Sequence, residues 1–265
     1  MLVTDSPSPA DDLALLRDAA QEAARIAMRY FRKNPKVSWK AGQSPVTEAD
    51  FAVDAYLQHE LMNARPGYGW LSEESLDDRK RLAARRTFVV DPIDGTRAFI
   101  EGNDVWCVSV AVVENNRPVA GVLNCPARGE VYEAAKGQGA FLNNRALTSK
   151  ERPAEITFSA SKSTMARLPA KWSLPIRAVP HVPSLAYRLA MIASGALDGT
   201  FVKPNSHDWD IAAADLILSE TGGSLRNADG TTPLFATENP AHHILVAGNH
   251  HFIDEMLRVV ASVSL

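Results

Sequence analysis

The chain has 265 residues, of which 46% are hydrophobic and 22% are charged, and its formal net charge is −3. A chain of this length and composition can bury a substantial core in one or two domains. The small negative charge argues against nonspecific binding to nucleic acid or to a membrane surface. The first residues lack a basic or apolar leader, and no later apolar run reaches membrane-spanning length, so a cytoplasmic location is expected.

The first predicted element is a helix. Residues 1–10 are expected to be disordered, and Asn34-Pro35 would end the helix. The apolar positions with helical spacing are Leu13, Leu16, Ala20, Ala23, Ala27 and Phe31. A second helix is predicted to begin at Thr47 and to continue through Leu61, because Thr47 and Asp50 are spaced as in a capping box.

Acidic residues follow the next two predicted strands. Residues 68–71 indicate a strand that runs into Glu73 and Glu74, and the apolar residues 88–90 indicate a strand that ends at Asp91. These two strands would place carboxylates at two strand ends. The alternative interpretation of the Glu-Glu pair is a solvated surface.

The segment DPIDGT, residues 91–96, is the strongest indication of metal chemistry. Pro92 and Gly95 favour a tight turn that would project Asp94 to the same side as Asp91. Two carboxylates in this arrangement can share one or two divalent cations, and oxygen-only ligation suits Mg²⁺ or Mn²⁺ rather than zinc. A short helix after the turn would leave backbone N–H groups free to hold a phosphate. The alternative is an ordinary Asx-type turn after a strand.

The remaining elements predict a mixed α/β or α+β fold. From residue 87 to 142, short apolar runs separated by turns indicate a largely antiparallel sheet, in which Cys107 and Cys125 would be buried thiols. Thereafter strands alternate with helices, with a soft boundary between sub-domain 1–150, which carries most candidate ligands, and sub-domain 151–265. The predicted strands are 156–160, 177–179, 199–202 and 244–246, and the predicted helices are 184–194, 208–221 and 249–260.

Asp210 is a third candidate acid, distant in sequence from the others. The segment His207-Asp208-Trp209-Asp210 opens a predicted helix, which places Asp210 in the first turn. An acid in this position is favoured by the helix dipole without any ligand. Three acidic segments in one chain arise by chance far more rarely than any one of them alone.

Five segments together resemble the inositol monophosphatase family of Mg²⁺-dependent, typically lithium-sensitive phosphomonoesterases. They are SPVTEAD (44–50), LSEES (71–75), DPIDGTRAF (91–99), GQGAFLN (137–143) and WDIAAADLILSETGG (209–223). The first, third and last, in this order and spacing, are highly specific for the superfamily but far less so for its substrate. The resemblance implies a layered α-β-α-β-α fold, a homodimer, two or three Mg²⁺ ions and a small phosphorylated metabolite as substrate.

The resemblance also implies a role for each candidate site residue. The metal ligands would be Glu73, Asp91, Asp94, Asp210 and the carbonyl of Ile93. Thr96, oriented by Asp50, would position the attacking water, so these two residues and Glu73 would be catalytic. Asp50 could cap the second helix and orient Thr96 at the same time. Glu74 would support the ligands from behind, and the substrate would contact Gly95, Thr96, Ser184, Lys203 and Asp210.

The substrate is the least determined property. In inositol-selective members, a Gly-Thr-Ala segment and an acid seven residues before the Asp of the Trp-Asp pair contact sugar hydroxyls. Here Pro183-Ser184-Leu185 and Lys203 take these places. An ammonium group cannot accept hydrogen bonds from a polyol but pairs well with a second phosphate. Lys203 therefore favours a bisphosphorylated nucleotide over inositol monophosphate, unless it is only a solvated lysine at a strand end.

Two further alternatives stay open. The segments 44–50 and 97–100 resemble the branch that hydrolyses 3′-phosphoadenosine 5′-phosphate, whereas Val105-Trp106 resembles the histidinol-phosphate branch. A nonenzymatic regulatory or binding protein on this fold is an alternative of a different class. A degenerate enzyme would be expected to lose its metal ligands first, and here all the acidic ligands are present. Catalysis is therefore the favoured hypothesis.

Overall fold

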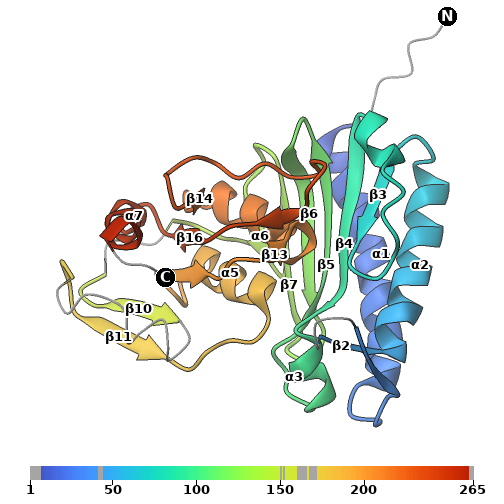
Figure 1. Ribbon diagram of the computed structural model, residues 1–265, viewed down its shortest axis with the longest axis horizontal. Coiled ribbons are helices and arrows are strands. Elements are labelled where there is room, and N and C mark those ends of the chain that lie inside the picture. Colours follow the sequence, from blue (N-terminus) through green and yellow to red (C-terminus); the bar gives the residue numbers. More distant parts are fainter. Residues whose placement is uncertain are drawn as a thin grey trace, which may run out of the picture.

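Five alternating layers of helices and sheets make up the protein (Figure 1). The computed structural model describes residues 7–40, 44–149, 151, 153–159, 166 and 172–262. The mixed α+β class and the layered α-β-α-β-α arrangement expected from the sequence are both confirmed. Of residues 1–10, expected to be disordered, the first six lie outside the described residues, and the expectation is wrong for Pro9 and Ala10, which begin the first helix.

Two long helices, α1 (Pro9–Tyr30) and α2 (Glu48–Ala64), form the first layer. The predicted capping box of α2 is confirmed, because Thr47 caps the helix and its backbone N–H donates to Asp50 at 2.8 Å. Helix α1 begins at a second capping box, formed by Ser8 and Asp11, that was not predicted. A hairpin of β1 (Val37–Trp39) and β2 (Pro45–Thr47) joins the two helices.

A seven-stranded sheet forms the second layer, and its strands follow one another in chain order. The only parallel pair in it is β3 with β4, so the prediction of a largely antiparallel sheet is confirmed. Its strands are β3 (Gly69–Ser72), β4 (Arg86–Asp94), β5 (Cys107–Glu114), β6 (Arg117–Cys125), β7 (Glu130–Ala135), β8 (Ala140–Leu142) and β9 (Arg145–Ala146). A 3₁₀ turn, η1 (Lys80–Ala83), precedes β4.

The end of β4 differs from the prediction. The strand was expected to end at Asp91, but it continues to Asp94. Asp91 pairs with Ser109 and Asp94 with Cys107, so three steps along β4 match two along β5. This extra residue is a β-bulge, which redirects a strand without ending its pairing. The turn comes at Gly95, and the short helix α3 (Thr96–Ile100) follows as predicted.

The third layer consists of helices α5 (Leu185–Ala193) and α6 (Asp208–Glu220), which agree with the predicted helices to within one residue at each end. The fourth is a five-stranded sheet in the order β11 (Ile176–Val179), β10 (Ile156–Ser159), β12 (Gly199–Val202), β16 (Leu245–Gly248) and β14 (Ser224–Asn227). Strand β14 was not predicted. The last residue of predicted strand 156–160 lies outside the described residues.

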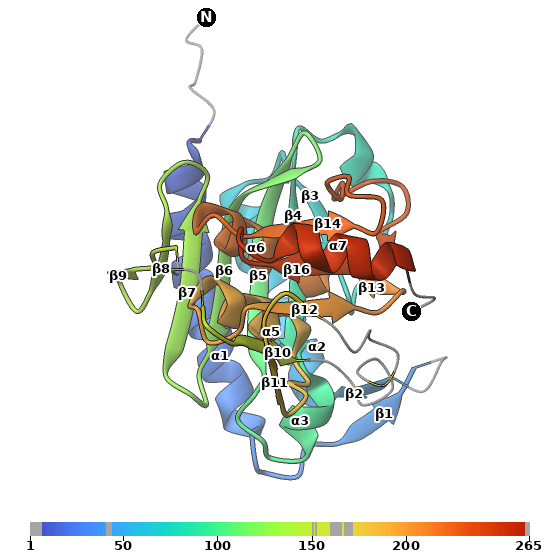
Figure 2. The same cartoon turned by 90° about the vertical axis from the view of Figure 1, so that its left-hand side faces the viewer.

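Helix α7 (Ile253–Ser262) forms the fifth layer, and Figure 2 shows it crossing the outer face of the second sheet. It begins four residues later than predicted, because a hydrogen bond from the Phe252 N–H to the Asn249 carbonyl closes a turn first. A small ladder of β13 (Ser206–His207) and β15 (Ala241–His242) leads into α6. Within the described residues, none of the helices combines the length and the apolar character needed to cross a membrane.

A hydrophobic cluster connects the two sheets. It joins Leu71 and Val89 of the first sheet to Leu245 of the second through α5 and α6. Cys107 belongs to it, and both cysteines are free, buried thiols as predicted. The first sheet ends at residue 146 and the second begins at residue 156. The division into sub-domains near residue 150 stays a prediction, since one core spans both sides of it.

Candidate active site

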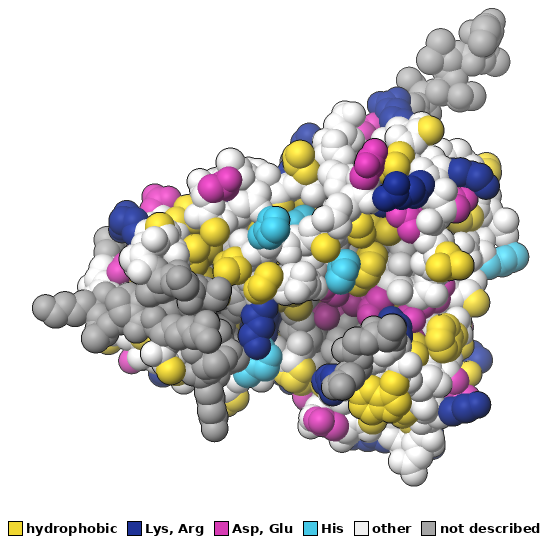
Figure 3. Space-filling model, in the orientation of Figure 1, with side chains coloured by type: hydrophobic (Ala, Val, Ile, Leu, Met, Phe, Trp, Pro, Cys, Tyr) yellow, Lys and Arg dark blue, Asp and Glu magenta, His cyan; other side chains and the backbone are white. Residues whose placement is uncertain are grey.

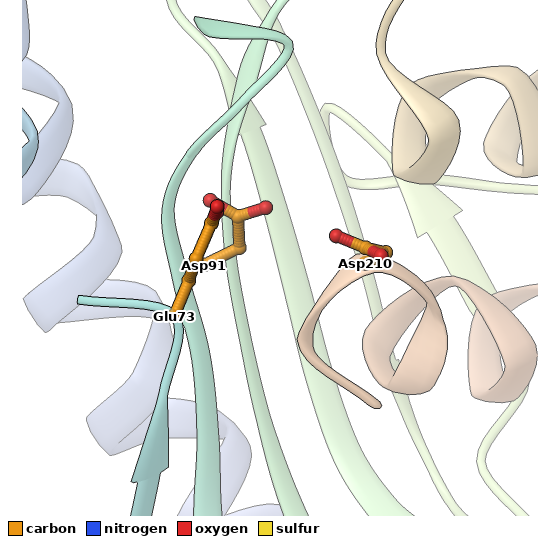
Figure 4. A group of neighbouring side chains, drawn as sticks. All are labelled: Glu73, Asp91 and Asp210. Carbon is orange, nitrogen blue, oxygen red and sulfur yellow. The ribbon is translucent and has the colours of Figure 1, made fainter. Parts of the chain in front are cut away.

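Three acidic side chains from three elements converge on one point. Glu73 follows β3, Asp91 lies in β4, and Asp210 lies in the first turn of α6. One carboxylate oxygen of each lies within 4.8 Å of an oxygen of the other two. Figure 4 shows Glu73, just after β3, side by side with Asp91 of β4, and Asp210 facing them from the helix. The fold thus brings together three of the predicted metal ligands.

These carboxylates line a cavity of about 420 Å³, here called the acidic cavity. Figure 3 shows acidic side chains in a hollow near the middle of the molecule. Other predicted site residues also line the cavity, namely Ile93, Asp94, Gly95 and Thr96. The hollow is therefore large enough for a small ligand and is lined by most of the acids that the sequence singled out.

The crowding of these acids disfavours their ionisation. Removal from solvent, reinforced by the neighbouring carboxylates, raises the pKa of Asp91 and of Asp210 above the ordinary value of an aspartate. A divalent cation between them would offset this repulsion, and carboxylate oxygens are the ligands that Mg²⁺ and Mn²⁺ prefer. The donor set therefore fits the predicted metal. The Asx-type turn is present as well, because Asp91 accepts the Ile93 N–H at 3.0 Å.

Asp94 lines the same cavity but has different partners. Its carboxylate accepts the Ser184 hydroxyl and the backbone N–H groups of Leu185 and Ala186, the latter at 2.7 Å. These contacts anchor the beginning of α5 to the bulge of β4. Burial, opposed by these hydrogen bonds, raises the pKa of Asp94 to about 6. Asp94 is thus near the three converging acids without being one of them.

Thr96 is held between two acceptors. Its hydroxyl oxygen lies 3.0 Å from the Ile93 carbonyl and 3.4 Å from a carboxylate oxygen of Asp50. The predicted contact between Thr96 and Asp50 is therefore present. Because a hydroxyl has one proton to donate, its lone pairs remain available to a donor such as water. Burial raises the pKa of Asp50 to about 6, although the Thr47 hydrogen bonds oppose this.

Gly95 adopts a conformation that glycine tolerates best. Its φ angle is +95°, and a Cβ atom there would lie 3.1 Å from the Ser184 Cβ and from the Val105 carbonyl. A side chain at this position would therefore be strained and would crowd the anchor between β4 and α5. Gly95 therefore allows the backbone to turn sharply between Asp94, at the end of β4, and the first residue of α3.

Lys40 is a charged residue of the site that the sequence did not reveal. Its ammonium group lies 2.9 Å from Glu73 and 2.6 Å from Glu74. Burial opposes the charged form of Lys40, but these two carboxylates raise its pKa overall. Burial also disfavours the charged form of Glu74 and raises its pKa to about 7. The supporting role of Glu74 stays a prediction. The only possible signal for Lys40 was its position in the hairpin just before the segment 44–50.

Ser184 and Lys203 occupy different places. Ser184 is fully buried as the N-cap of α5, with its hydroxyl directed to Asp94. Its contact with substrate stays a prediction. Lys203 is exposed just after β12 and lines a second cavity of about 280 Å³, here called the cationic cavity. The two cavities adjoin, since His181, Pro183 and Asp210 line both.

The beginning of α6 is fixed by contacts that the sequence did not signal. Asp208 is fully buried and accepts hydrogen bonds from the His242 ring and from the Ala236 N–H, both at 2.7 Å. The Asp210 carboxylate accepts the backbone N–H of His207 at 2.7 Å. These contacts set the direction in which Asp210 faces the other acids.

Comparisons with known proteins agree with this geometry. The inositol monophosphatase family matches residues 10–262. A histidinol-phosphatase of Mycobacterium tuberculosis is 32% identical, over 93% of this chain and 96% of that protein. An inositol-1-monophosphatase of Mesorhizobium japonicum is 31% identical, over 94% of this chain and 95% of that protein. The solved structure of the extragenic suppressor protein suhB from Bartonella henselae is 29% identical and covers 94% of this chain and 98% of its own, with a TM-score of 0.78.

The match extends over nearly the whole chain, and both curated relatives exceed 30% identity. Their names include two different substrates, so the comparisons determine the family and not the metabolite. Members of the family are phosphatases that hydrolyse phosphate monoesters. The chain, with its predicted acids converging in one cavity, belongs to the inositol monophosphatase family.

Proposed function

We propose that this protein is a Mg²⁺-dependent phosphomonoesterase that uses water to hydrolyse a small phosphorylated metabolite. The observation that carries the proposal is the convergence of Glu73, Asp91 and Asp210 within 4.8 Å at the acidic cavity. Buried carboxylates so close together repel one another unless a cation or protons intervene. A site of this kind is suited to binding metal rather than to stabilising the fold.

Glu73, Asp91 and Asp210 would hold Mg²⁺, joined by the Ile93 carbonyl and by Asp94. Bound Mg²⁺ supplies positive charge that favours attack by water and stabilises the leaving oxygen. Two ions, and a third held more weakly, agree with the resemblance, and Mn²⁺ suits the same ligands. Asp94 would have to share its carboxylate between metal and the beginning of α5, where it accepts three hydrogen bonds.

Thr96 would orient the attacking water. Its hydroxyl can donate to Asp50 or to the Ile93 carbonyl while its lone pairs accept a hydrogen bond from that water. Asp50 would fix the direction of this hydroxyl, because Asp50 itself is held by Thr47 at 2.6 Å and 2.8 Å. Gly95 and Thr96 line the cavity and would contact the phosphate.

The candidate substrates are inositol monophosphate and a 3′(2′),5′-bisphosphate nucleotide, with histidinol phosphate as the alternative. The cationic cavity beside the acids supports a substrate with more than one charged group. The homodimer stays a prediction of the family resemblance, and the cytoplasmic location stays a prediction of the sequence. A nonenzymatic role on this fold stays an alternative.

The direct test is phosphate release with Mg²⁺ from inositol 1-phosphate, adenosine 3′,5′-bisphosphate, histidinol phosphate and fructose bisphosphate. We expect hydrolysis of at least one, dependent on Mg²⁺ and inhibited by lithium. Glu73→Gln should abolish it, and Glu60→Gln, an exposed change on α2, should not. Release that is equal in wild type and Glu73→Gln, or that persists in a chelator, would contradict the proposal.

A further inference from the structure

The cationic cavity contains a buried arginine that the sequence analysis did not single out. Arg188 lies on α5, one turn after its N-cap, and lines the cavity with Lys203. Only 6% of its surface is exposed. A buried guanidinium is ordinarily paired with a carboxylate, because an unpaired charge away from water is costly. The partners of Arg188 are therefore informative.

Its partners leave much of the guanidinium unused. Nη1 donates to the Val182 carbonyl at 2.9 Å and lies 3.2 Å from Nδ1 of His181. Since a guanidinium only donates, the His181 nitrogen must be the acceptor, which requires a neutral ring. Nε is buried without a hydrogen-bond partner. Within the described part of the chain, Arg188 has no carboxylate at ion-pair distance.

The other ionisable side chains that line the cationic cavity with Arg188 are His181, Lys203 and Asp210. Burial lowers the pKa of Arg188 to about 10, with only Asp94 acting to raise it. Burial lowers the pKa of His181 too, and the nearby charges of Arg188 and Lys203 lower it further. Two basic side chains, Arg188 and Lys203, therefore line one cavity, with Asp210 as the acid at its border. Figure 3 shows basic and histidine side chains beside the acidic hollow.

We propose that the cationic cavity is a second anion-binding subsite, in which Arg188 and Lys203 bind a phosphate group of the substrate that is not hydrolysed. The unused Nε edge of Arg188 offers directional donors, and Lys203 adds a mobile charge at the rim. Because the two cavities share His181, Pro183 and Asp210, one small molecule can occupy both. This inference rests on the proposed function and specifies its substrate class as a bisphosphorylated metabolite.

The first test does not depend on catalysis. Metal-free protein in a chelator is titrated with inorganic phosphate by calorimetry, so that the acidic cavity has no metal with which to attract the anion. We expect one saturable site per chain, weakened at least tenfold in Arg188→Gln and in Lys203→Gln. Arg188→Lys, which keeps a charge, should lose less, and Lys136→Gln, at an exposed turn, should match wild type. No saturable binding, or equal binding in all these variants, would overturn the subsite.

The second test compares two substrates that differ only in the second phosphate. Adenosine 3′,5′-bisphosphate and adenosine 3′-monophosphate are assayed with Mg²⁺. We expect the ratio of their kcat/KM values to fall at least tenfold in Arg188→Gln and in Lys203→Gln. If Arg188→Gln does not fold, as judged by circular dichroism, Lys203→Gln decides, since its side chain is exposed.

The outcomes separate the two proposals. If wild type hydrolyses both substrates but the ratio is unchanged in the variants, the subsite is wrong and the phosphatase proposal stands. If wild type binds inorganic phosphate through Arg188 without hydrolysing any substrate, the phosphatase proposal fails and the anion site stands.

Discussion

The acidic and the cationic cavity are adjacent, yet acidic side chains predominate in the first and basic side chains in the second. In the first, Glu73, Asp91 and Asp210 converge, and Lys40 forms an ion pair with Glu73. In the second, Arg188 and Lys203 line the cavity, and within the described residues neither has a carboxylate at ion-pair distance. Each arrangement is costly for the folded protein alone and becomes favourable when a ligand of opposite charge binds.

The difference shows why these charges are not simply paired with each other. Arg188 lies on α5, and the hydrogen bonds that Asp94 accepts from Ser184, Leu185 and Ala186 anchor the beginning of this helix to the bulge of β4. A direct ion pair between Asp210 and a basic residue would stabilise the fold but would leave neither metal nor anion a binding site. Charges that remain unpaired lower the stability of the ligand-free protein but leave it able to bind ligands of opposite charge.

Removing one acid should have the largest effect. We expect Asp210→Asn to lower kcat by about 10³ or more, the size typical of one lost transition-state contact, because a metal ligand is lost. Folding should survive, since the substitution relieves repulsion. Steady-state phosphate release at saturating Mg²⁺ measures this. Retention of more than about a tenth of wild-type turnover would show that Asp210 is not a ligand and that the acidic cavity has another role.

The next largest effect should be the pH dependence of stability that Asp50, the partner of Thr96, confers. Burial raises the pKa of Asp50 to about 6, so the folded protein keeps a proton that the unfolded chain has lost between about pH 4 and 6. The stability from Asp50 is therefore complete below pH 4 and is lost as the pH rises through 6. In a chelator, the stability of wild type relative to Asp50→Asn should fall by about 2 kcal/mol over this range.

Denaturant unfolding at a series of pH values measures this difference. Mg²⁺ should reduce the slope, because a bound cation favours the ionised carboxylates. The matched control is Asp229→Asn, since hydrogen bonds with Thr231 lower the pKa of this exposed acid and no slope of this sign should appear. A difference that grows with pH would mean that Asp50 is stabilised as a carboxylate even without metal.

Reversing the charge of Lys203 should have the third largest effect, on the choice between two substrates. Lys203→Glu would place a carboxylate where an ammonium now lines the cationic cavity. We expect kcat/KM for adenosine 3′,5′-bisphosphate to fall roughly ten- to a hundredfold relative to that for inositol 1-phosphate, because repulsion replaces a charge-assisted hydrogen bond. Lys203→Gln should give a smaller change. Equal changes for both substrates would show that Lys203 does not select between them.

The smallest expected effect tests the anchor between β4 and the beginning of α5. Ser184→Ala removes the N-cap of α5 and one donor to Asp94. We expect a loss of about 1 kcal/mol in the free energy of unfolding, which corresponds to a Tm lower by roughly 2–4 °C. Ser194→Ala, at the other end of α5, should cost less. Equal losses would indicate that the contact with Asp94 adds nothing to ordinary helix capping.

The sequence by itself determined the local structure and the candidate acids. Hydrophobic periodicity located the helices and most strands, since it depends on residues a few positions apart. The extent of β4 could not be predicted, because Pro92 and Gly95 look like a turn and the bulge requires pairing with β5. Likewise, α7 begins late owing to a turn at Asn249, whose side chain contacts the distant Asp198.

Only the tertiary structure decided how the charges are partnered. The family pattern identified Asp210, but the folding of α6 against the first sheet places it opposite Glu73 and Asp91. Lys40 and Arg188 carried no signal, because a lysine in a hairpin and an arginine in a helix are commonplace in sequence. Their meaning arises from burial and from the charges around them, which depend on contacts between residues far apart in the chain.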